Sequence, residues 1–252
     1  MKFSWNSFYL LLISFFLIAF QTLSFKQQQL KYPRVRQAYQ NKESSLQQLL
    51  KKQGIQQNKL HIYLRAFKQE KEMELWGKNA EDKQYRLIRT YDVCSTSGVL
   101  GPKRKQGDLQ IPEGYYHIDR FNPYSNFHLS LGVNYPNRSD KILGVNGKLG
   151  GDIFIHGACV TIGCLPITDA EIEELYIFCT EAKNNGQTTI PVSIFPAKLT
   201  DENYQLLTSA YNHDTDRLGL WEDLRQGYLL FNETKQLPSI GFLKNGRHRV
   251  SR

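Results

Sequence analysis

The spacing of hydrophobic residues changes along the chain, and one early stretch has the period of a helix. Apolar side chains recur every three to four positions from Val35 to Leu50, and Lys51 and Gly54 are typical of a helix end. This pattern predicts one helix, or two helices broken near Asn41. Residues 27–33, which precede it, are predicted to form a short linker.

From residue 60 onward, apolar and polar positions alternate, which is typical of strands. The predicted strands are His61–Phe67, Met73–Trp76, Tyr85–Val93 and, much later, Pro191–Pro196. Before the last of these, Thr168 and the acidic residues that follow it predict the start of a helix. The tail contains a predicted amphipathic helix from Leu218 to Tyr228 and a basic end, residues 244–252, which we expect to be loosely held.

The N-terminus has the composition of a targeting segment. Lys2 precedes an apolar run from Phe8 to Phe20, which has the length of a signal-peptide core and is short for a membrane span. Thr22 and Ser24 offer a small-x-small cleavage site, although neither is alanine, so an uncleaved signal anchor remains the alternative. Because no cysteine lies near the run, a lipoprotein anchor is excluded. We expect the rest of the chain to be exported.

Composition limits the class of protein. The 252 residues leave room for one medium-sized domain with extensions, and 40% hydrophobic with 22% charged residues is ordinary for a globular chain. The net charge is +8, and between residues 26 and 60 eight Lys or Arg stand against one acid, Glu43. Such a surface suits anionic lipid, nucleic acid or an anionic polymer. Without a Gly-rich phosphate loop or an aromatic-arginine platform, nucleic acid is not expected as a partner.

The segment IHGACVTIGCLPITD carries the strongest candidate for chemistry, because His156 and Cys164 stand eight positions apart in it. An imidazole can take the proton of a nearby thiol, and the resulting thiolate is a strong nucleophile. Gly163 permits a tight turn before the cysteine, so backbone N–H groups there would face an oxyanion. The alternative is a buried structural cysteine near a core histidine.

Two further stretches favour the catalytic interpretation: LGPKRKQGDLQIPEGYYHIDRFNP, residues 100–123, and FHLSLGVNYPNRSD, which places His128 on a predicted strand. Followed by the His-Gly and Thr-x-Gly-Cys motifs, they resemble the L,D-transpeptidase catalytic domain, or YkuD domain, of bacterial cell-wall enzymes. The resemblance covers residues 59–195 and is greatest to a basic, short-spaced branch. It implies a mainly β fold with α additions, a β-sandwich or barrel with largely antiparallel strands and helical flanks.

The resemblance also implies a division of the chain. Residues 1–24 are expected to be a signal peptide or signal anchor, and residues 25–58 a basic helical extension. Residues 59–196 would form the catalytic domain and residues 197–252 a helical C-terminal extension. An enzyme of this kind would work in the periplasm or cell envelope of a bacterium, touching the membrane only through an uncleaved anchor.

The family's catalytic residues carry over to four positions. By resemblance, Cys164 attacks a carbonyl of a peptidoglycan stem peptide and forms a thioester, and His156 accepts and returns the proton. The backbone carbonyl of Gly157 orients His156, and the N–H groups of Gly163 and Cys164 are the candidate oxyanion donors. No cofactor and no metal are implied.

The residues expected on the substrate side are less specific. His128, Thr161, Tyr135 and Arg138 are candidates for substrate binding, with Asn134 and Asp140 at the same mouth. The basic residues 103–105 would meet stem-peptide carboxylates. The alternatives are a satisfied strand histidine, a threonine that caps a turn and a solvated basic loop.

Two departures from the family pattern leave the reaction open. The His–Cys spacing is shorter than in many members, and Leu165-Pro166-Ile167 stands where many carry an arginine. The cysteine chemistry survives, but the acyl acceptor does not follow: an amine of another stem peptide or of an outer-membrane lipoprotein would make a transpeptidase. Water would make a carboxypeptidase or cross-link amidase. A non-catalytic peptidoglycan-binding module is the alternative from another class.

Four cysteines in an exported chain raise the question of disulfides. Cys164 has to be free as a nucleophile, which leaves Cys94, Cys159 and Cys179 and at most one bridge. We expect all three to be buried thiols. The histidines are scattered and lack paired metal-ligand spacing, so a structural zinc site is not expected.

Overall fold

A computed structural model describes residues 23–252. The predicted signal run, Phe8–Phe20, lies outside the described residues. None of the helices between residues 23 and 252 combines the length and apolarity needed to cross a bilayer. The division of the chain into an extension, a catalytic domain and a C-terminal extension stays a prediction.

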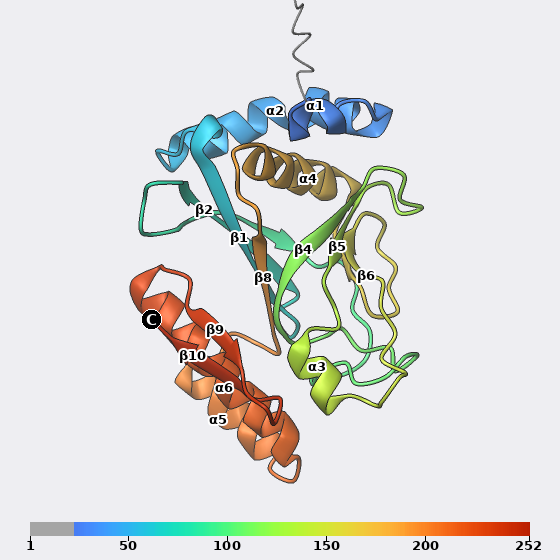
Figure 1. Cartoon of the computed structure of the whole chain (residues 1–252), viewed down its shortest axis with the longest axis vertical. Coiled ribbons are helices and arrows are strands. Elements are labelled where there is room, and N and C mark those ends of the chain that lie inside the picture. Colours follow the sequence, from blue (N-terminus) through green and yellow to red (C-terminus); the bar gives the residue numbers. More distant parts are fainter. Residues whose placement is uncertain (1–22) are drawn as a thin grey trace, which may run out of the picture.

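One curled, eight-stranded mixed sheet forms the centre of the molecule (Figure 1). Its strands are β1 (Leu60–Phe67), β2 (Glu72–Asn79), β3 (Arg86–Asp92), β4 (Gly114–Asn122), β5 (Ser130–Val133), β6 (Ile153–His156), β7 (Leu165–Pro166) and β8 (Ile190–Phe195). Their order is β3-β2-β1-β8-β4-β5-β6-β7. The pairs β1–β8 and β6–β7 are parallel and the others antiparallel, which confirms the predicted mainly β class with helical additions.

Helices and a small hairpin surround the sheet (Figure 1). They are α1 (Phe25–Gln29), α2 (Pro33–Lys52), the 3-10 turn η1 (Gln57–Lys59), α3 (Arg138–Leu143), α4 (Asp169–Asn184), α5 (Asp201–Ala210), α6 (Thr215–Thr234), β9 (Ser239–Phe242) and β10 (His248–Ser251). In Figure 1, α2 and α4 stack above the sheet, while α5, α6 and the β9–β10 hairpin lie at its opposite end.

The N-terminal helices differ from the sequence prediction in two respects. Residues 25–29 form α1, capped by Ser24, where a linker was predicted. Helix α2 is continuous through Asn41, the suspected break, whose side chain donates a hydrogen bond to Glu173 on α4 at 2.8 Å. Tyr39 likewise donates to Glu181 at 2.8 Å. Helix α2 is therefore fixed to α4 by specific polar contacts as well as by its buried apolar face.

Helix α6 and the β9–β10 hairpin, which we call the C-terminal layer, bury a second hydrophobic cluster. Phe67 and Phe195 on the sheet pack with Trp221, Leu224 and Tyr228 on α6. The basic end is ordered as β10, so the expectation of a loose tail is wrong. The reason is Asp223 on α6, which accepts hydrogen bonds from the guanidinium of Arg247 at 2.6 and 2.8 Å and from the backbone of His248 at 2.7 Å.

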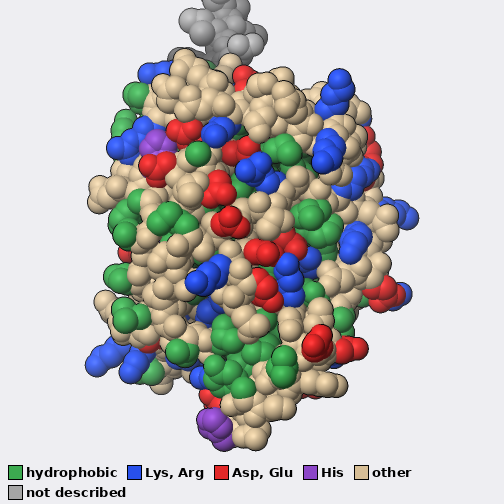
Figure 2. All heavy atoms as spheres, turned by 180° about the vertical axis from the view of Figure 1, so that it is seen from behind, with side chains coloured by type: hydrophobic (Ala, Val, Ile, Leu, Met, Phe, Trp, Pro, Cys, Tyr) green, Lys and Arg blue, Asp and Glu red, His purple; other side chains and the backbone are tan. Residues whose placement is uncertain are grey.

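Charges of both signs are interspersed on the face seen in Figure 2, and a group of hydrophobic side chains lies toward its lower end. Although the chain has a net charge of +8, its Lys and Arg side chains do not form a single basic patch on this face.

Candidate active site

His156 and Cys164 lie at the two ends of one short loop. Strand β6 ends at His156, β7 begins directly after Cys164, and the two strands run parallel with His156 beside Pro166. Residues 157–163, here called the site loop, connect the end of β6 to the start of β7, which lies beside β6. His156 and Cys164 both line a pocket of about 270 Å³, together with Phe127, Val160, Thr161 and Ile162.

The imidazole of His156 is held by its neighbours on two sides. Its Nδ1 lies 2.5 Å from the carbonyl oxygen of Gly157, and its ring packs against Phe127 with 4.6 Å between ring centroids. A ring nitrogen that faces a carbonyl carries the proton, which leaves Nε2 as the acceptor in the neutral ring. Burial lowers the pKa of His156 and the Gly157 carbonyl raises it, with burial prevailing. The ring is accordingly suited to accept a proton.

The thiol of Cys164 is protonated in its resting environment. Burial raises the pKa of Cys164 and is the largest cause of the shift, while a hydrogen bond with the backbone of Phe154 lowers this pKa. The negative charge of Asp152 raises the pKa further, and the positive charge of Lys103 lowers it. Its sulfur lies 3.6 Å from the carbonyl oxygen of Asp152. Within residues 23–252, no direct hydrogen bond joins Cys164 to His156, so the resting pair is a thiol and a neutral imidazole that share a pocket.

Thr161 closes the turn that carries the cysteine. Its hydroxyl oxygen accepts hydrogen bonds from the N–H groups of Gly163 at 3.1 Å and Cys164 at 2.8 Å, and it donates to the Cys164 carbonyl at 2.9 Å. The two backbone groups expected to face an oxyanion are thus occupied by Thr161 in this conformation. Gly163 has a φ of +138°, and a Cβ there would lie 3.1 Å from the carbonyl oxygen of Gln110, so the turn requires glycine.

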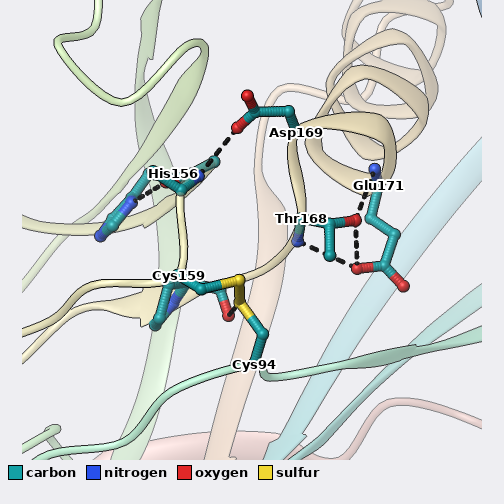
Figure 3. Close-up of a disulfide and its surroundings, with 9 residues drawn as sticks. Cys94, His156, Cys159, Thr168, Asp169 and Glu171 are labelled. Carbon is teal, nitrogen blue, oxygen red and sulfur yellow. Dashed lines mark hydrogen bonds between the residues drawn. A yellow bond between two sulfur atoms is a disulfide. The ribbon is translucent and has the colours of Figure 1, made fainter.

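A disulfide between Cys94 and Cys159 ties the site loop to the segment after β3 (Figure 3). The expectation of three buried thiols is therefore wrong for these two residues, while Cys179 is a free, buried thiol on α4. The two bridged cysteines are 65 positions apart, and the segment after β3 brings them together, because the N–H of Cys94 donates to the carbonyl of Pro166 on β7 at 3.1 Å. Cys164 is the other free cysteine.

Asp169, at the start of α4, also contacts the site loop. Its Oδ1 accepts the N–H of Ala158 at 2.8 Å (Figure 3). Ala158 has a φ of +59°, a left-handed conformation that residues other than glycine rarely adopt. Sequence reasoning assigned Asp169 to the acidic first turn of a helix and missed this contact, because nothing local in the sequence shows that the turn faces the site loop.

His128 lies elsewhere than predicted. It sits in a bend before β5 with a φ of +67°, a backbone conformation incompatible with the predicted strand. Its Nε2 is 2.9 Å from Glu173 on α4, and its carbonyl accepts a hydrogen bond from Arg34 at 2.8 Å. The neighbouring Phe127, which sequence reasoning passed over, supplies the side chain that lines the pocket.

The remaining substrate candidates are not among the described residues that line the pocket of Cys164. Tyr135 is buried, and its hydroxyl faces the backbone carbonyls of Lys103 and Leu149 at 3.4 and 3.2 Å. Arg138 is exposed at the start of α3. A substrate contact by His128, Tyr135 or Arg138 stays a prediction.

Other polar residues near the predicted mouth are engaged within the protein. Lys103 pairs with Asp108 at 2.6 Å, and Arg104 pairs with Asp140 at 3.0 Å. The side chain of Asn134 accepts the backbone N–H of His117 at 2.7 Å. Lys103 and Arg104 therefore already have carboxylate partners, unlike the solvated loop that the sequence suggested as an alternative.

Comparison with known proteins shows which family the chain resembles. The L,D-transpeptidase catalytic domain (YkuD) model matches residues 62–194. YafK of Escherichia coli (strain K12), a provisionally named L,D-transpeptidase, is 37% identical over 193 residues, which cover 76% of this chain and 74% of YafK.

Two solved structures align less closely. The helical cell shape determining protein Pgp2 from Campylobacter jejuni is 18% identical over 73% of both chains, with a TM-score of 0.43. Bd1075 of Bdellovibrio bacteriovorus is 17% identical over 73% of this chain and 77% of its own, with a TM-score of 0.39. These two likenesses are too weak to bear on function.

Proposed function

The chain belongs to the L,D-transpeptidase catalytic domain family, and we propose that it transfers acyl groups of peptidoglycan stem peptides through a thioester on Cys164. The observation that carries this proposal is the pocket lined by both His156 and Cys164. A buried, neutral imidazole and a free thiol in one pocket are the two groups that such a reaction needs.

The first half of the proposed reaction forms the thioester. As the donor peptide binds, Nε2 of His156 takes the thiol proton and the sulfur of Cys164 attacks the peptide carbonyl. The carbonyl carbon becomes tetrahedral and then expels the amine of the next residue, which receives the proton from His156. Because Nδ1 is fixed on the Gly157 carbonyl, Nε2 both accepts the thiol proton and later donates it to the leaving amine.

The second half transfers the acyl group. A neutral amine of an acceptor attacks the thioester, His156 removes its proton, and Cys164 leaves as a thiolate that takes this proton back. We propose another stem peptide as the acceptor, with an amine of an outer-membrane lipoprotein as the alternative. Exposed Val160 and Ile162 at the pocket rim would be covered by the acceptor, which keeps water from the thioester and favours transfer over hydrolysis.

The developing oxyanion needs donors, and we propose the N–H groups of Gly163 and Cys164. Both donate to the Thr161 hydroxyl in the resting conformation. Rotation of the Thr161 side chain would release them to the substrate oxygen, which takes over the same two hydrogen bonds. The hydroxyl thus preserves the orientation of these donors while no substrate is bound.

The location follows from the substrate. A chain that acts on stem peptides works in the periplasm or cell envelope, and the apolar run Phe8–Phe20 would direct its export.

Incubation of the purified protein with peptidoglycan sacculi, with the muropeptides then read by mass, tests the proposal. New cross-linked or lipoprotein-linked species are expected, and Cys164→Ala should produce none while keeping its circular dichroism spectrum. Loss of existing links or of terminal D-residues would replace transfer by hydrolysis through the same thioester. Unchanged muropeptides with the wild-type protein would overturn the enzymatic proposal and leave a peptidoglycan-binding module.

A further inference from the structure

We propose that Asp169 is a positioning residue for His156 and acts through the peptide group that joins Gly157 to Ala158. The inference rests on the proposed role of His156 as the proton acceptor for Cys164. It adds a charged group to a site in which, among residues 23–252, the hydrogen-bond partner of the His156 ring is a main-chain carbonyl.

One peptide group carries both hydrogen bonds. Its carbonyl, on Gly157, faces His156 Nδ1 at 2.5 Å, and its N–H, on Ala158, donates to Asp169 Oδ1 at 2.8 Å (Figure 3). The two ends of a peptide group are conjugated, so a carboxylate on the N–H increases the electron density on the carbonyl oxygen. Asp169 therefore strengthens the acceptor that orients the imidazole and favours its protonated form.

The local backbone is arranged around this contact. Ala158 is held in the left-handed region with a φ of +59°, which costs free energy that the surrounding contacts have to offset. A Cβ on Gly157 would lie 2.5 Å from Asp169 Oδ1 and 2.8 Å from the Phe127 carbonyl oxygen. Glycine at 157 thus leaves space for the carboxylate to reach the peptide group.

Helix capping alone does not account for Asp169. The cap of α4 is completed by Thr168 and Glu171, whose side chains each bond the backbone N–H of the other residue. Asp169 instead turns toward the site loop, while Glu171 faces the cap (Figure 3). Two carboxylates in one helical turn therefore have different partners, and Glu171 provides a matched control for the charge of Asp169.

Other charged groups of the described residues lie near His156 and Cys164. Asp152 and Lys103 act on the Cys164 thiol with opposite signs. His128, whose Cβ borders Gly157, pairs with Glu173 on α4. Because Asp169 is exposed, solvent screens its charge through space, and the hydrogen-bonded peptide group is the route by which it influences the ring.

The test is the pH dependence of Cys164 alkylation by iodoacetamide in the full chain, read by mass on the peptide that contains Cys164. The variants are Asp169→Asn, which keeps an oxygen acceptor for the Ala158 N–H but removes the charge, Asp169→Ala, and Glu171→Gln. Without the charge of Asp169, protonated His156 is less favoured, so the transfer of the Cys164 proton to the ring is less favoured too. For Asp169→Asn we therefore expect the midpoint of the alkylation profile to rise by about half a pH unit, with about a threefold slower reaction at neutral pH. Glu171→Gln should leave the profile unchanged.

Three other outcomes would contradict the inference or the proposed function on which it rests. If Asp169→Asn matches the wild type and only Asp169→Ala reacts slowly, Asp169 is purely structural and the inference is wrong. If Glu171→Gln shifts the profile as much as Asp169→Asn, the effect is a through-space charge and the peptide route is wrong. If wild-type Cys164 is not alkylated at any pH, the proposed nucleophile itself fails. Should Asp169→Ala not fold, the pair Asp169→Asn and Glu171→Gln still decides.

Discussion

The site loop and the C-terminal layer are held in place by different means. In the C-terminal layer, Trp221 is fully buried among apolar side chains, and its indole N–H donates to Glu113 at 2.7 Å. The site loop exposes 56% of Val160 and 79% of Ile162. It is fixed by the disulfide of Cys159 and by the hydrogen bonds of Asp169 and Thr161.

A buried ion pair also joins the C-terminal layer to the sheet. Under the C-terminal layer, Lys68 is enclosed, with its Nζ 2.8 Å from Glu113 and close to the carbonyls of Val99, Gly101 and Ile111. Glu113 is also bound by Trp221, so this network joins the sheet to α6. Changes there should reduce stability and leave the reactivity of folded molecules intact. Changes to the hydrogen bonds of Asp169 and Thr161 in the site loop should slow the reaction of Cys164 and leave stability nearly unchanged.

The largest expected effect on stability is that of Trp221→Ala. The lost packing and the cavity should lower the free energy of unfolding by about 3–5 kcal/mol, measured by urea denaturation. Trp221→Phe, which keeps most of the ring area, should lose less. Alkylation of Cys164 per folded molecule should not change in either variant. Slow alkylation with normal stability would contradict the separation of the two regions.

Removal of the disulfide, by Cys94→Ser together with Cys159→Ser, should have the next largest effect. A bridge of this kind typically contributes about 2–4 kcal/mol, so the thermal midpoint should fall and the site loop should become more sensitive to proteolysis. A thiol reductant should reproduce this change in the wild type and have no further effect on the double variant. Equal protease sensitivity of all three samples would show that the bridge does not restrain the loop.

Two buried aspartates should give opposite pH dependence. Burial raises the pKa of Asp140 to about 6, although hydrogen bonds from Asn137 and the charge of Arg104 oppose it. Burial also disfavours the charge of Asp223, but Arg247 and His248 outweigh this and lower its pKa to about 2.

The signs follow from proton linkage. The contribution of Asp140 to stability is full below its unfolded pKa of 3.8 and is lost as the pH rises through about 6. We expect a decline of about 3 kcal/mol over that interval in urea denaturation, and Asp140→Asn should abolish it. The contribution of Asp223 is present above pH 3.8 and is lost as the pH falls toward 2. A decline between pH 4 and 6 that persists in Asp140→Asn would contradict the assignment.

The smallest effect is expected for Thr161→Val, which keeps the shape of the side chain but removes its hydroxyl. Without the three hydrogen bonds that close the turn, Cys164 should be placed less well, and acylation should slow by about tenfold, or about 1.4 kcal/mol. Thr161→Ser keeps the hydroxyl and should react at nearly the wild-type rate. Faster acylation of Thr161→Val would show that the hydroxyl obstructs the oxyanion donors.

The sequence was informative wherever the determining contacts are local. Alternation predicted β1, β2, β3 and β8, and helical spacing predicted α2, because both patterns report which face of an element is buried. The cap at Thr168 predicted the start of α4. His156 and Cys164 were found because they flank one short loop with glycines at its ends.

Contacts between distant segments were not predictable in the same way. Three candidate cysteines allowed three pairings, and only the contact of the segment after β3 with Pro166 on β7 selects Cys94 and Cys159. The tail looked loose because its charges were counted without Asp223, its partner on α6. His128 was assigned to a strand because a single left-handed residue leaves no signal in the alternation of its neighbours.

The most direct test of the account is to trap the acyl-enzyme. The purified protein is mixed with a stem-peptide donor without acceptor, quenched in acid, and digested, and the peptide that contains Cys164 is weighed. We predict a mass increase equal to the mass of the donor minus that of the free amino acid or peptide released from it. This increase should be removed by hydroxylamine, absent in Cys164→Ala and strongly reduced in His156→Ala. Two results would contradict the account: turnover of the donor by the wild type without any adduct on Cys164, and undiminished turnover of the donor by Cys164→Ala.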